Sequence, residues 1–205
     1  MLRRGFSVFG TSAVMFANLC VGAQADEINV KLGVLADMSG IFSDIGGAGA
    51  AEATRMAAED FMKMEGSQNI RVEVISADAQ NKPDVSNAIA REWLNADGVH
   101  AILDMPTSAI SLSLAPVARD ANKVALLTAS GTSDLTGTAC TPNSVHWTYD
   151  TWALSHGTAD ALTREGAKKW FFLTVDFALG HSLERDATAV IKENGGEVVG
   201  AVRHP

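Results

Sequence analysis

Residues 99–127 read VHAILDMPTSAISLSLAPVARDANKVALL and contain two short apolar runs with a helix-like segment between them. The runs at 99–103 and 123–127 have the length and the apolar character of strands that are covered on both faces. Between them, Thr107 and Ser108 lie where a strand would turn into a helix. A strand, a turn, a helix and a second strand in this order predict a βαβ unit with parallel strands.

The same alternation extends in both directions from this unit. Upstream, we expect strands at 28–36 and 69–77 and helices at 49–65 and 83–98. Downstream, we expect helices at 155–167 and 180–196 and strands at 168–175 and 197–204. On helix 49–65, one apolar face is expected to turn toward the core; it is formed by Ala53, Met56, Ala57 and Phe61. Strands that alternate with helices at this spacing predict an α/β fold with mostly parallel sheets.

A polar segment rich in Gly and Thr, residues 130–142, is the expected boundary between two α/β units. We therefore expect a first lobe at 26–142 and the start of a second lobe at 143–205. Four strands are expected in the first lobe and about three in the second.

Residues 1–25 have the features of a cleaved export signal. Two arginines precede an apolar stretch, and Ala23-Gln24-Ala25 matches an A-x-A cleavage site. The apolar stretch is short and interrupted by Gly, Ser and Asn, which disfavours a membrane anchor. Cys20 does not follow a small residue, which disfavours a lipidated cysteine. We therefore expect a periplasmic protein whose mature chain begins at or near Asp26.

The composition excludes several classes of partner and scaffold. Without residues 1–25 the formal net charge falls from −8 to −10, which argues against nucleic acid and anionic membrane surfaces as partners. Cys140 would then be the one remaining cysteine. A hydrophobic core, rather than a set of disulfides, must therefore stabilise the fold.

Polar or small residues follow three of the expected strands at the point where each strand ends. They are Ser39, Gly40 and Phe42 after the first strand, Thr107 and Ser108 after the third, and Ser130 and Thr132 after the fourth. Any one of these hydroxyls would be explained as a helix cap. Because the carboxyl ends of parallel strands meet at one edge of a sheet, the whole set predicts a polar-lined cleft. The helix N-termini at such an edge favour carboxylates and phosphates.

Motifs for catalysis and metal binding are missing from the sequence. Residues 46–52, GGAGAAE, do not match G-x-G-x-x-G and carry no P-loop lysine. The sequence has no G-x-S-x-G elbow, and its histidines lack metal-ligand spacing. Asp150 and Asp176 could face the cleft, but two carboxylates alone are weak evidence for acid–base catalysis. We expect no enzymatic activity, no cofactor and no metal.

Four stretches of the sequence together resemble a known family. They are INVKLGVLADMSGIFSDIG (28–46), DAQNKPDVSNAIAREWL (78–94), DMPTSAISLSLAPVARDANKVALLTASGTSDLT (104–136) and VDFALGHSLERD (175–186). In order and spacing they resemble the periplasmic binding proteins of branched-chain amino-acid ABC importers. The resemblance covers nearly all of the chain from Ile28. It implies a type I periplasmic-binding fold, in which two lobes with parallel sheets and flanking helices close over a small ligand.

The resemblance also implies ligand contacts at the strand ends. A serine that binds the ligand's α-carboxylate in the family falls on Ser108, with Ala109 beside it. Two further contacts follow the fourth strand, one from a backbone group and one from a threonine. They fall on Ser130 and Thr132.

Three more residues complete the expected site. Phe42 lies near the position of an aromatic wall that some members carry, and Asp176 is expected to face the cleft. Tyr149, in the aromatic-rich segment 146–152, would form a pocket wall or pack at the hinge. The disulfide of some members is missing, because Gln80 and about Thr107 stand at its positions.

The implied function is that of a receptor rather than an enzyme. The protein is expected to be a monomer that delivers an amino acid or related small carboxylate to an ABC transporter permease in the inner membrane. Two alternatives stay open. One is the ligand-sensing domain of a receptor or regulator with the same fold, and the other is a binder of an aromatic acid.

The chain stops at Pro205, directly after an expected strand and without a helix to cover it. We therefore expect the N-terminal half of a longer protein, with an incomplete second lobe. In the family an acidic residue pairs with the ligand's ammonium group, and its position would lie beyond Pro205.

Overall fold

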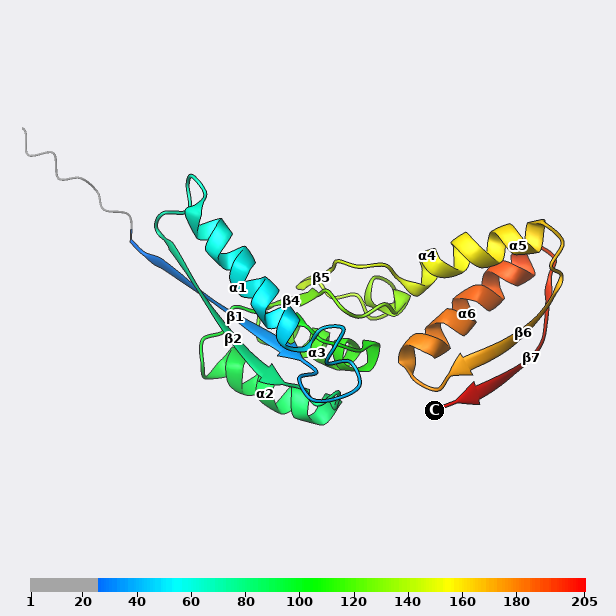
Figure 1. Ribbon diagram of the computed structural model, residues 1–205, viewed down its shortest axis with the longest axis horizontal. Coiled ribbons are helices and arrows are strands. Elements are labelled where there is room, and N and C mark those ends of the chain that lie inside the picture. The colour runs from blue at the N-terminus through cyan, green and yellow to red at the C-terminus, as the bar shows by residue number, and fades with distance from the viewer. Residues whose placement is uncertain (1–25) are drawn as a thin grey trace, which may run out of the picture.

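The computed structural model describes residues 26–205, so the expected export signal at 1–25 lies outside the described residues. The chain forms two α/β units that lie side by side along the long axis of the molecule (Figure 1). A five-stranded sheet organises the first unit and a two-stranded sheet organises the second. Every strand pair in both sheets is parallel, which confirms the α/β fold with parallel sheets. None of the helices in the described part of the chain is long and apolar enough to cross a membrane.

The first sheet has the strand order β2-β1-β3-β4-β5. Its strands are β1 (Ile28–Ala36), β2 (Ile70–Asp78), β3 (Ala101–Asp104), β4 (Val124–Leu127) and β5 (Ser144–His146). Because all five run in parallel, their carboxyl ends, and the loops that follow them, lie at one edge of the sheet. The turn residues identified in the sequence are therefore brought together there.

Helices cover both faces of the first sheet (Figure 1). They are α1 (Gly47–Lys63) on one face, and α2 (Pro83–Asn95) and α3 (Ser108–Asp120) on the other. Pro83 stands in the first turn of α2, where its missing N–H costs nothing. Gly98 follows the end of α2 with a φ of +72°, a left-handed conformation that glycine adopts without strain.

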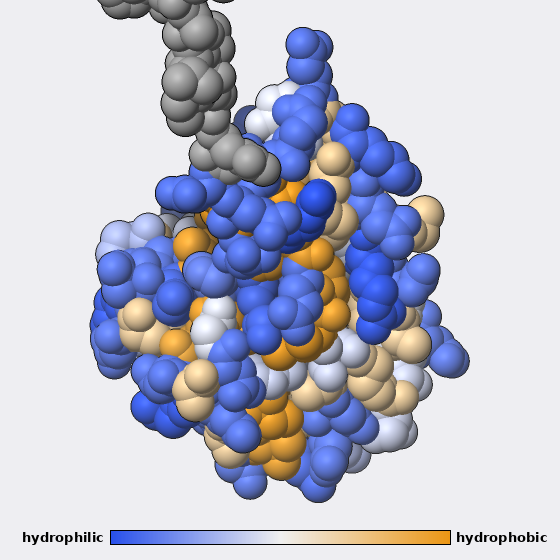
Figure 2. All heavy atoms as spheres, turned by 90° about the vertical axis from the view of Figure 1, so that its left-hand side faces the viewer, coloured by the Kyte–Doolittle hydropathy of each residue, from blue (hydrophilic) through white to orange (hydrophobic). Residues whose placement is uncertain are grey.

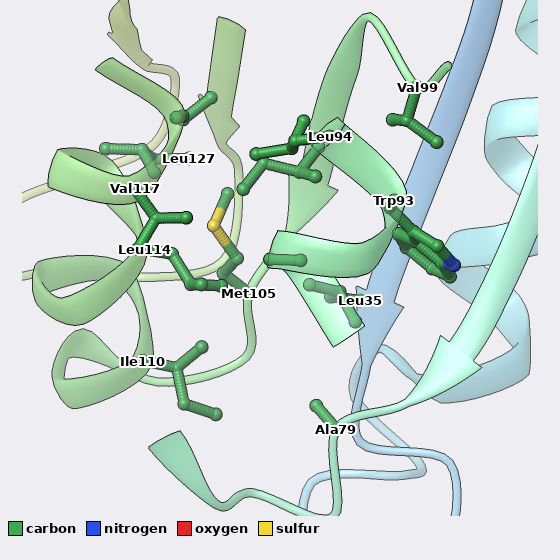
Figure 3. Close-up of a cluster of buried hydrophobic side chains, with 14 of the residues drawn as sticks. Leu35, Ala79, Trp93, Leu94, Val99, Met105, Ile110, Leu114, Val117 and Leu127 are labelled. Atoms are coloured by element: carbon green, nitrogen blue, oxygen red, sulfur yellow. The ribbon is translucent and has the colours of Figure 1, made fainter. Parts of the chain in front are cut away.

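The main hydrophobic core lies between the sheet and the α2–α3 pair (Figure 3). Leu35 from β1, Trp93 from α2 and Leu114 from α3 all point into it. Val34 and Ala36 alternate with Leu35 along β1 and form a smaller cluster with Ala51 under α1. This alternation follows from the two-residue period of a strand, which sends neighbouring side chains to opposite faces.

The second unit begins with a helical segment from Thr151 to Arg164. It comprises α4 (Thr151–Ser155), a π-helical turn (His156–Asp160) and α5 (Ala161–Arg164). Two parallel strands follow, β6 (Lys169–Val175) and β7 (Glu197–His204), connected by α6 (Ala178–Glu193). Val190 and Ile191 of α6 form the centre of its small core.

The structure differs from the expected strand count. Strand β5 was not expected, and it pairs in parallel with β4, so the first sheet has five strands rather than four. The first sheet therefore includes residues 144–146, which lie beyond the expected boundary at 142. The second sheet has two strands in the described residues rather than about three. A strand as short as Ser144–His146 carries too little periodicity to be recognised, and its pairing with β4 is what defines it.

The expected buried face of α1 was also wrong. Gly47, Ala51 and Ala58 are the buried residues of this helix, whereas Met56 and Phe61 are exposed. Ala53, Ala57 and Phe61 of the expected face instead line an open groove of about 600 Å³ along the helix, which we call the α1 groove. Figure 2 shows hydrophobic surface gathered in the middle of the corresponding end of the molecule, with polar residues around it.

Candidate ligand-binding site

Two pockets meet at Phe42, at the carboxyl edge of the first sheet. The Asp104 pocket has a volume of about 390 Å³, and its lining includes Phe42, Ile45, Gly46, Ala50, Asp104, Pro106, Thr128 and Tyr149. The interunit pocket has a volume of about 230 Å³ and is lined by Ile41, Phe42, Asn81, Thr107, Ala109, Phe177 and Ala178. Phe177 and Ala178 belong to the second unit, so the interunit pocket lies between the two units. A cleft of this kind is where open α/β sheets bind their ligands.

Asp37 shapes the loop that carries Phe42. Its buried carboxylate accepts hydrogen bonds from the backbone N–H groups of Gly40, at 2.8 Å, and Phe42, at 3.1 Å. A Cβ on residue 40 would overlap this carboxylate, so the turn requires glycine. Asp37 was not among the residues expected to shape the site. An aspartate directly after an apolar strand, followed three residues later by glycine, was the available signal.

The loops after β2 and β3 are joined at the interunit pocket. The hydroxyl of Thr107 donates a hydrogen bond to Asn81 Oδ1 at 3.0 Å, and both residues line the pocket. These are the loops that a disulfide connects in some relatives of the expected family. Here a hydrogen bond between side chains joins them.

Three of the expected contact residues, Ser108, Ser130 and Thr132, come together in one buried polar cluster. Ser108 Oγ accepts a hydrogen bond from the Thr132 N–H at 3.3 Å, and the Ser130 hydroxyl donates to the Met105 carbonyl at 2.8 Å. The Thr132 hydroxyl lies 2.7 Å from that of Ser182 in α6. All three side chains are buried and none lines either pocket. In this structure they hold the loops together, and direct contact with a ligand stays a prediction.

The other four expected residues differ in which pocket, if any, they line. Phe42 lines both pockets, Tyr149 lines the Asp104 pocket and Ala109 lines the interunit pocket. Tyr149 is 61% exposed, so most of its ring is available to a ligand. Asp176 lines neither pocket; its carboxylate lies 2.8 Å from His181 Nε2 and 3.7 Å from the Arg203 guanidinium.

Asp104 is a further residue of the site that the sequence analysis did not identify. It ends β3, lines the Asp104 pocket and is only 7% exposed. Burial raises the pKa of its carboxyl from 3.8 to about 6, because a charged group loses solvation in an apolar environment. The sequence offered a weak signal, an acidic residue directly after a buried strand. Its burial is set by distant parts of the chain.

A polar network fixes the second unit against the first. The Asp186 carboxylate in α6 accepts hydrogen bonds from Ser133 Oγ, at 2.7 Å, and Thr151 Oγ1, at 2.6 Å. Arg185 bridges Asp186 and Asp134. Although burial opposes the ionisation of Asp186, the hydrogen bonds and the Arg185 guanidinium hold its pKa below the usual value. These contacts keep α6 against the loop after β4, and with it the far wall of the interunit pocket.

Residues 29–205 match the model of a protein family described as periplasmic binding protein. The sequence is 28% identical over 196 residues to the Leu/Ile/Val-binding protein homolog 6 of Brucella abortus (strain 2308), covering 95% of this chain and 48% of that protein. The chain therefore spans about half the length of the curated relatives it matches.

Solved structures show the same relationship. A periplasmic binding protein from Burkholderia mallei is 45% identical, with a TM-score of 0.79, and the match covers 86% of this chain and 47% of that one. A branched-chain amino-acid ABC transporter periplasmic ligand-binding protein from Burkholderia xenovorans LB400 is 33% identical, with a TM-score of 0.71. That match covers 86% of this chain and 46% of the other.

Proposed function

Because the chain belongs to the periplasmic binding protein family, we propose that it is the extracytoplasmic solute-binding component of an ABC importer. Its ligand is an amino acid or a related small carboxylate. The observation that carries this proposal is the pair of pockets that meet at Phe42, with one wall supplied by the second unit. The names of the Brucella and Burkholderia xenovorans relatives, which refer to Leu/Ile/Val binding and to branched-chain amino acids, support this ligand class.

The ligand's carboxylate is held by helix N-termini. Helix α3 begins at Ser108 and α6 begins at Ala178, and neither N-terminus has a side-chain cap. The first N–H groups of a helix have no partner within it and lie at the positive end of its dipole. Ala109 and Ala178, in the first turns of these helices, both line the interunit pocket. A carboxylate in that pocket would therefore be stabilised from both units.

Direct ligand contacts are assigned to the three expected residues that line the pockets. Phe42 and Tyr149 offer ring surfaces to the apolar part of the ligand, and Ala109 borders its carboxylate. The two rings also favour an aromatic acid as a second ligand class. Delivery of the ligand to a permease in the inner membrane, from a periplasmic location, completes the proposed role and requires no catalytic residue.

Calorimetry on a protein that extends this chain to the length of its relatives tests this function, with leucine, phenylalanine and benzoate as probes. We expect at least one of them to bind with a Kd on the order of 1 μM, about −8 kcal/mol. Ala109→Leu should weaken that binding by at least tenfold, because the larger side chain fills the interunit pocket. Ala88→Leu is the matched control, since Ala88 lies exposed on α2 and lines neither pocket. Absence of binding by all three probes would contradict the proposal.

A further inference from the structure

Asn81 and Thr107 bring a pair of polar side chains to the interunit pocket. The other residues that line this pocket are isoleucine, phenylalanine or alanine. In an apolar cavity, the few polar groups that converge on it fix the orientation of a ligand and supply specificity. A polar substituent of a ligand in this pocket would therefore meet these two side chains.

Thr107 directs its hydroxyl away from the helix that it precedes. It stands at the N-cap of α3, where a threonine side chain usually accepts a hydrogen bond from a backbone N–H of the first turn. Here the side chain makes no such bond, and the hydroxyl donates instead to Asn81 Oδ1 at 3.0 Å. The first turn of α3 thus lacks its cap, and the hydroxyl oxygen keeps its lone pairs for another donor.

The turn after β2 holds Asn81 at the pocket. Gln80 and Asn81 have φ values of +51° and +48°, a left-handed conformation that is uncommon for residues other than glycine. The Asp78 carboxylate fixes this turn by accepting from the Gln80 N–H at 2.8 Å, and the Ala79 N–H donates to the Ala36 carbonyl at 2.7 Å. Asn81 is therefore presented by a turn that is anchored to β1.

The pair offers a ligand a donor beside an acceptor. With Thr107 as the donor, Asn81 Nδ2 has no hydrogen-bond partner among residues 26–205, and Thr107 Oγ1 is free to accept. If the amide nitrogen and oxygen exchange places, Asn81 Nδ2 donates to Thr107, which leaves Oδ1 to accept and the hydroxyl proton to donate. A hydroxyl group both donates and accepts, so it complements the pair in either arrangement.

The charges around the pair disfavour a protonated amine at this place. No charged side chain within residues 26–205 lines the interunit pocket. Asp78 and Lys82, which flank Asn81 in the sequence, line neither pocket, and Asp104 lines the other pocket, where its Oδ2 is buried. An ammonium group beside the pair would lose hydration without meeting an opposite charge. A neutral hydroxyl avoids this cost.

We propose that Asn81 and Thr107 bind a hydroxyl group of the ligand beside its carboxylate. The inference rests on the proposed function and narrows the ligand class to 2-hydroxy acids. Ala109 and Ala178, in the first turns of the two helices assigned to the carboxylate, line the same pocket as the pair. A pocket of about 230 Å³ leaves little room between these groups, so the hydroxyl belongs on the carbon next to the carboxylate.

Calorimetry on a protein extended to the length of the relatives tests this inference with probes that differ in one substituent. One series is 2-hydroxy-4-methylpentanoate, 4-methylpentanoate and leucine, and the other is 3-phenyllactate, 3-phenylpropanoate and phenylalanine. Within each series the second carbon carries a hydroxyl, a hydrogen or an ammonium group on the same skeleton. We expect the hydroxy acid to bind about tenfold more tightly than the other two members, as two neutral hydrogen bonds would give.

Thr107→Val and Asn81→Gly each remove one member of the pair. Valine keeps the branched shape of threonine, and glycine adopts the positive φ of residue 81 without strain. Each change should weaken binding of the hydroxy acid by about tenfold. Binding of the unsubstituted acid should stay within about twofold, because that acid has no group that meets the pair.

Thr158→Val and Asn122→Gly are the matched controls. Thr158 is exposed in the π-helical turn, and Asn122 is exposed with a φ of +53°, close to that of residue 81. Neither residue lines one of the two pockets, so both variants should keep the preference for the hydroxy acid. Thermal unfolding of each variant shows whether it has folded.

Each outcome separates the two proposals. If the parent protein binds the hydroxy acid no more tightly than the other members of its series, the solute-binding function holds and the role of Asn81 and Thr107 is wrong. That role is also wrong if either variant of the pair keeps the preference; a lower Tm would then show that the pair only joins the loops after β2 and β3. If no probe binds to the parent protein, both proposals fail.

Discussion

Burial of Asp104 makes the stability of the protein depend on pH in a defined direction. The pKa of this carboxyl is about 6 in the folded protein against 3.8 in its ordinary environment, so between these values the folded state holds a proton that the unfolded chain has released. The free energy of unfolding therefore falls as the pH rises from 3.8 to about 6. Above that range the ionised Asp104 lowers the free energy of unfolding by its full amount, about 3 kcal/mol.

We predict that Asp104→Asn removes this cost in the absence of ligand. At pH 7 the free energy of unfolding should rise by up to about 3 kcal/mol relative to the native protein. At pH 4 the two proteins should differ little, because the native carboxyl is then largely protonated. Urea denaturation across this pH range measures the effect. Parallel stability curves for the two proteins would show that Asp104 is not the group responsible.

At the scale of single elements, the start of α6 is constrained by its close approach to β6. A Cβ on Gly180 would overlap the carbonyl oxygen of Val175, the last residue of β6. The backbone cannot relieve this overlap by a side-chain rotation. Gly180 is therefore required by packing rather than by backbone conformation.

We predict that Gly180→Ala lowers the free energy of unfolding by about 1–3 kcal/mol. Gly157→Ala is the matched control, because a Cβ there would meet nothing within 4 Å. That change should be neutral or stabilise the helical segment by up to about 1 kcal/mol, since alanine favours helices over glycine. Thermal and chemical unfolding of both variants measure the difference. Equal stability of the two variants would contradict the packing argument.

At the scale of the whole molecule, Asp186 joins the two units through side chains. Its partner Ser133 follows β4 in the first unit, whereas its partner Thr151 begins α4 of the second unit, the unit to which Asp186 in α6 also belongs. Loss of the carboxylate would remove the acceptor of two hydroxyls and leave the Arg185 guanidinium with Asp134 as its remaining ion-pair partner among the described residues.

We predict that Asp186→Ala lowers the free energy of unfolding by about 2–4 kcal/mol, as expected for loss of a partly buried charged acceptor. Glu193→Ala, at the exposed end of α6, should have an effect within about 0.5 kcal/mol. Differential scanning calorimetry measures both. An Asp186→Ala protein as stable as the Glu193→Ala protein would show that the network adds nothing to the contact between the units.

Much of the fold was predictable because the apolar periodicity and the turn residues that define a strand or a helix are found within a short stretch of sequence. The strands at 28–36 and 197–204 were predicted at the residues where they occur. The ends of the other expected strands and helices lie within a few residues of the observed ends, except that the helix expected at 155–167 begins at Thr151. The part of the site that depends on strand ends was predictable for the same reason, since parallel topology brings Phe42 and Ala109 to one edge.

The sequence by itself therefore determined the α/β class, the order of the elements and the edge of the sheet where the pockets form. Only the tertiary structure decided that β5 joins the first sheet, that much of the apolar face of α1 lines a groove, that the hydroxyls of Ser130 and Thr132 are buried, and that Asp104 Oδ2 has no hydrogen-bond partner among residues 26–205. The physical reason is that periodicity and turn chemistry are properties of neighbouring residues. Burial and hydrogen bonding depend on what distant segments place around a residue, and the loss of hydration at Asp104 is set by α1 and the residues around Tyr149.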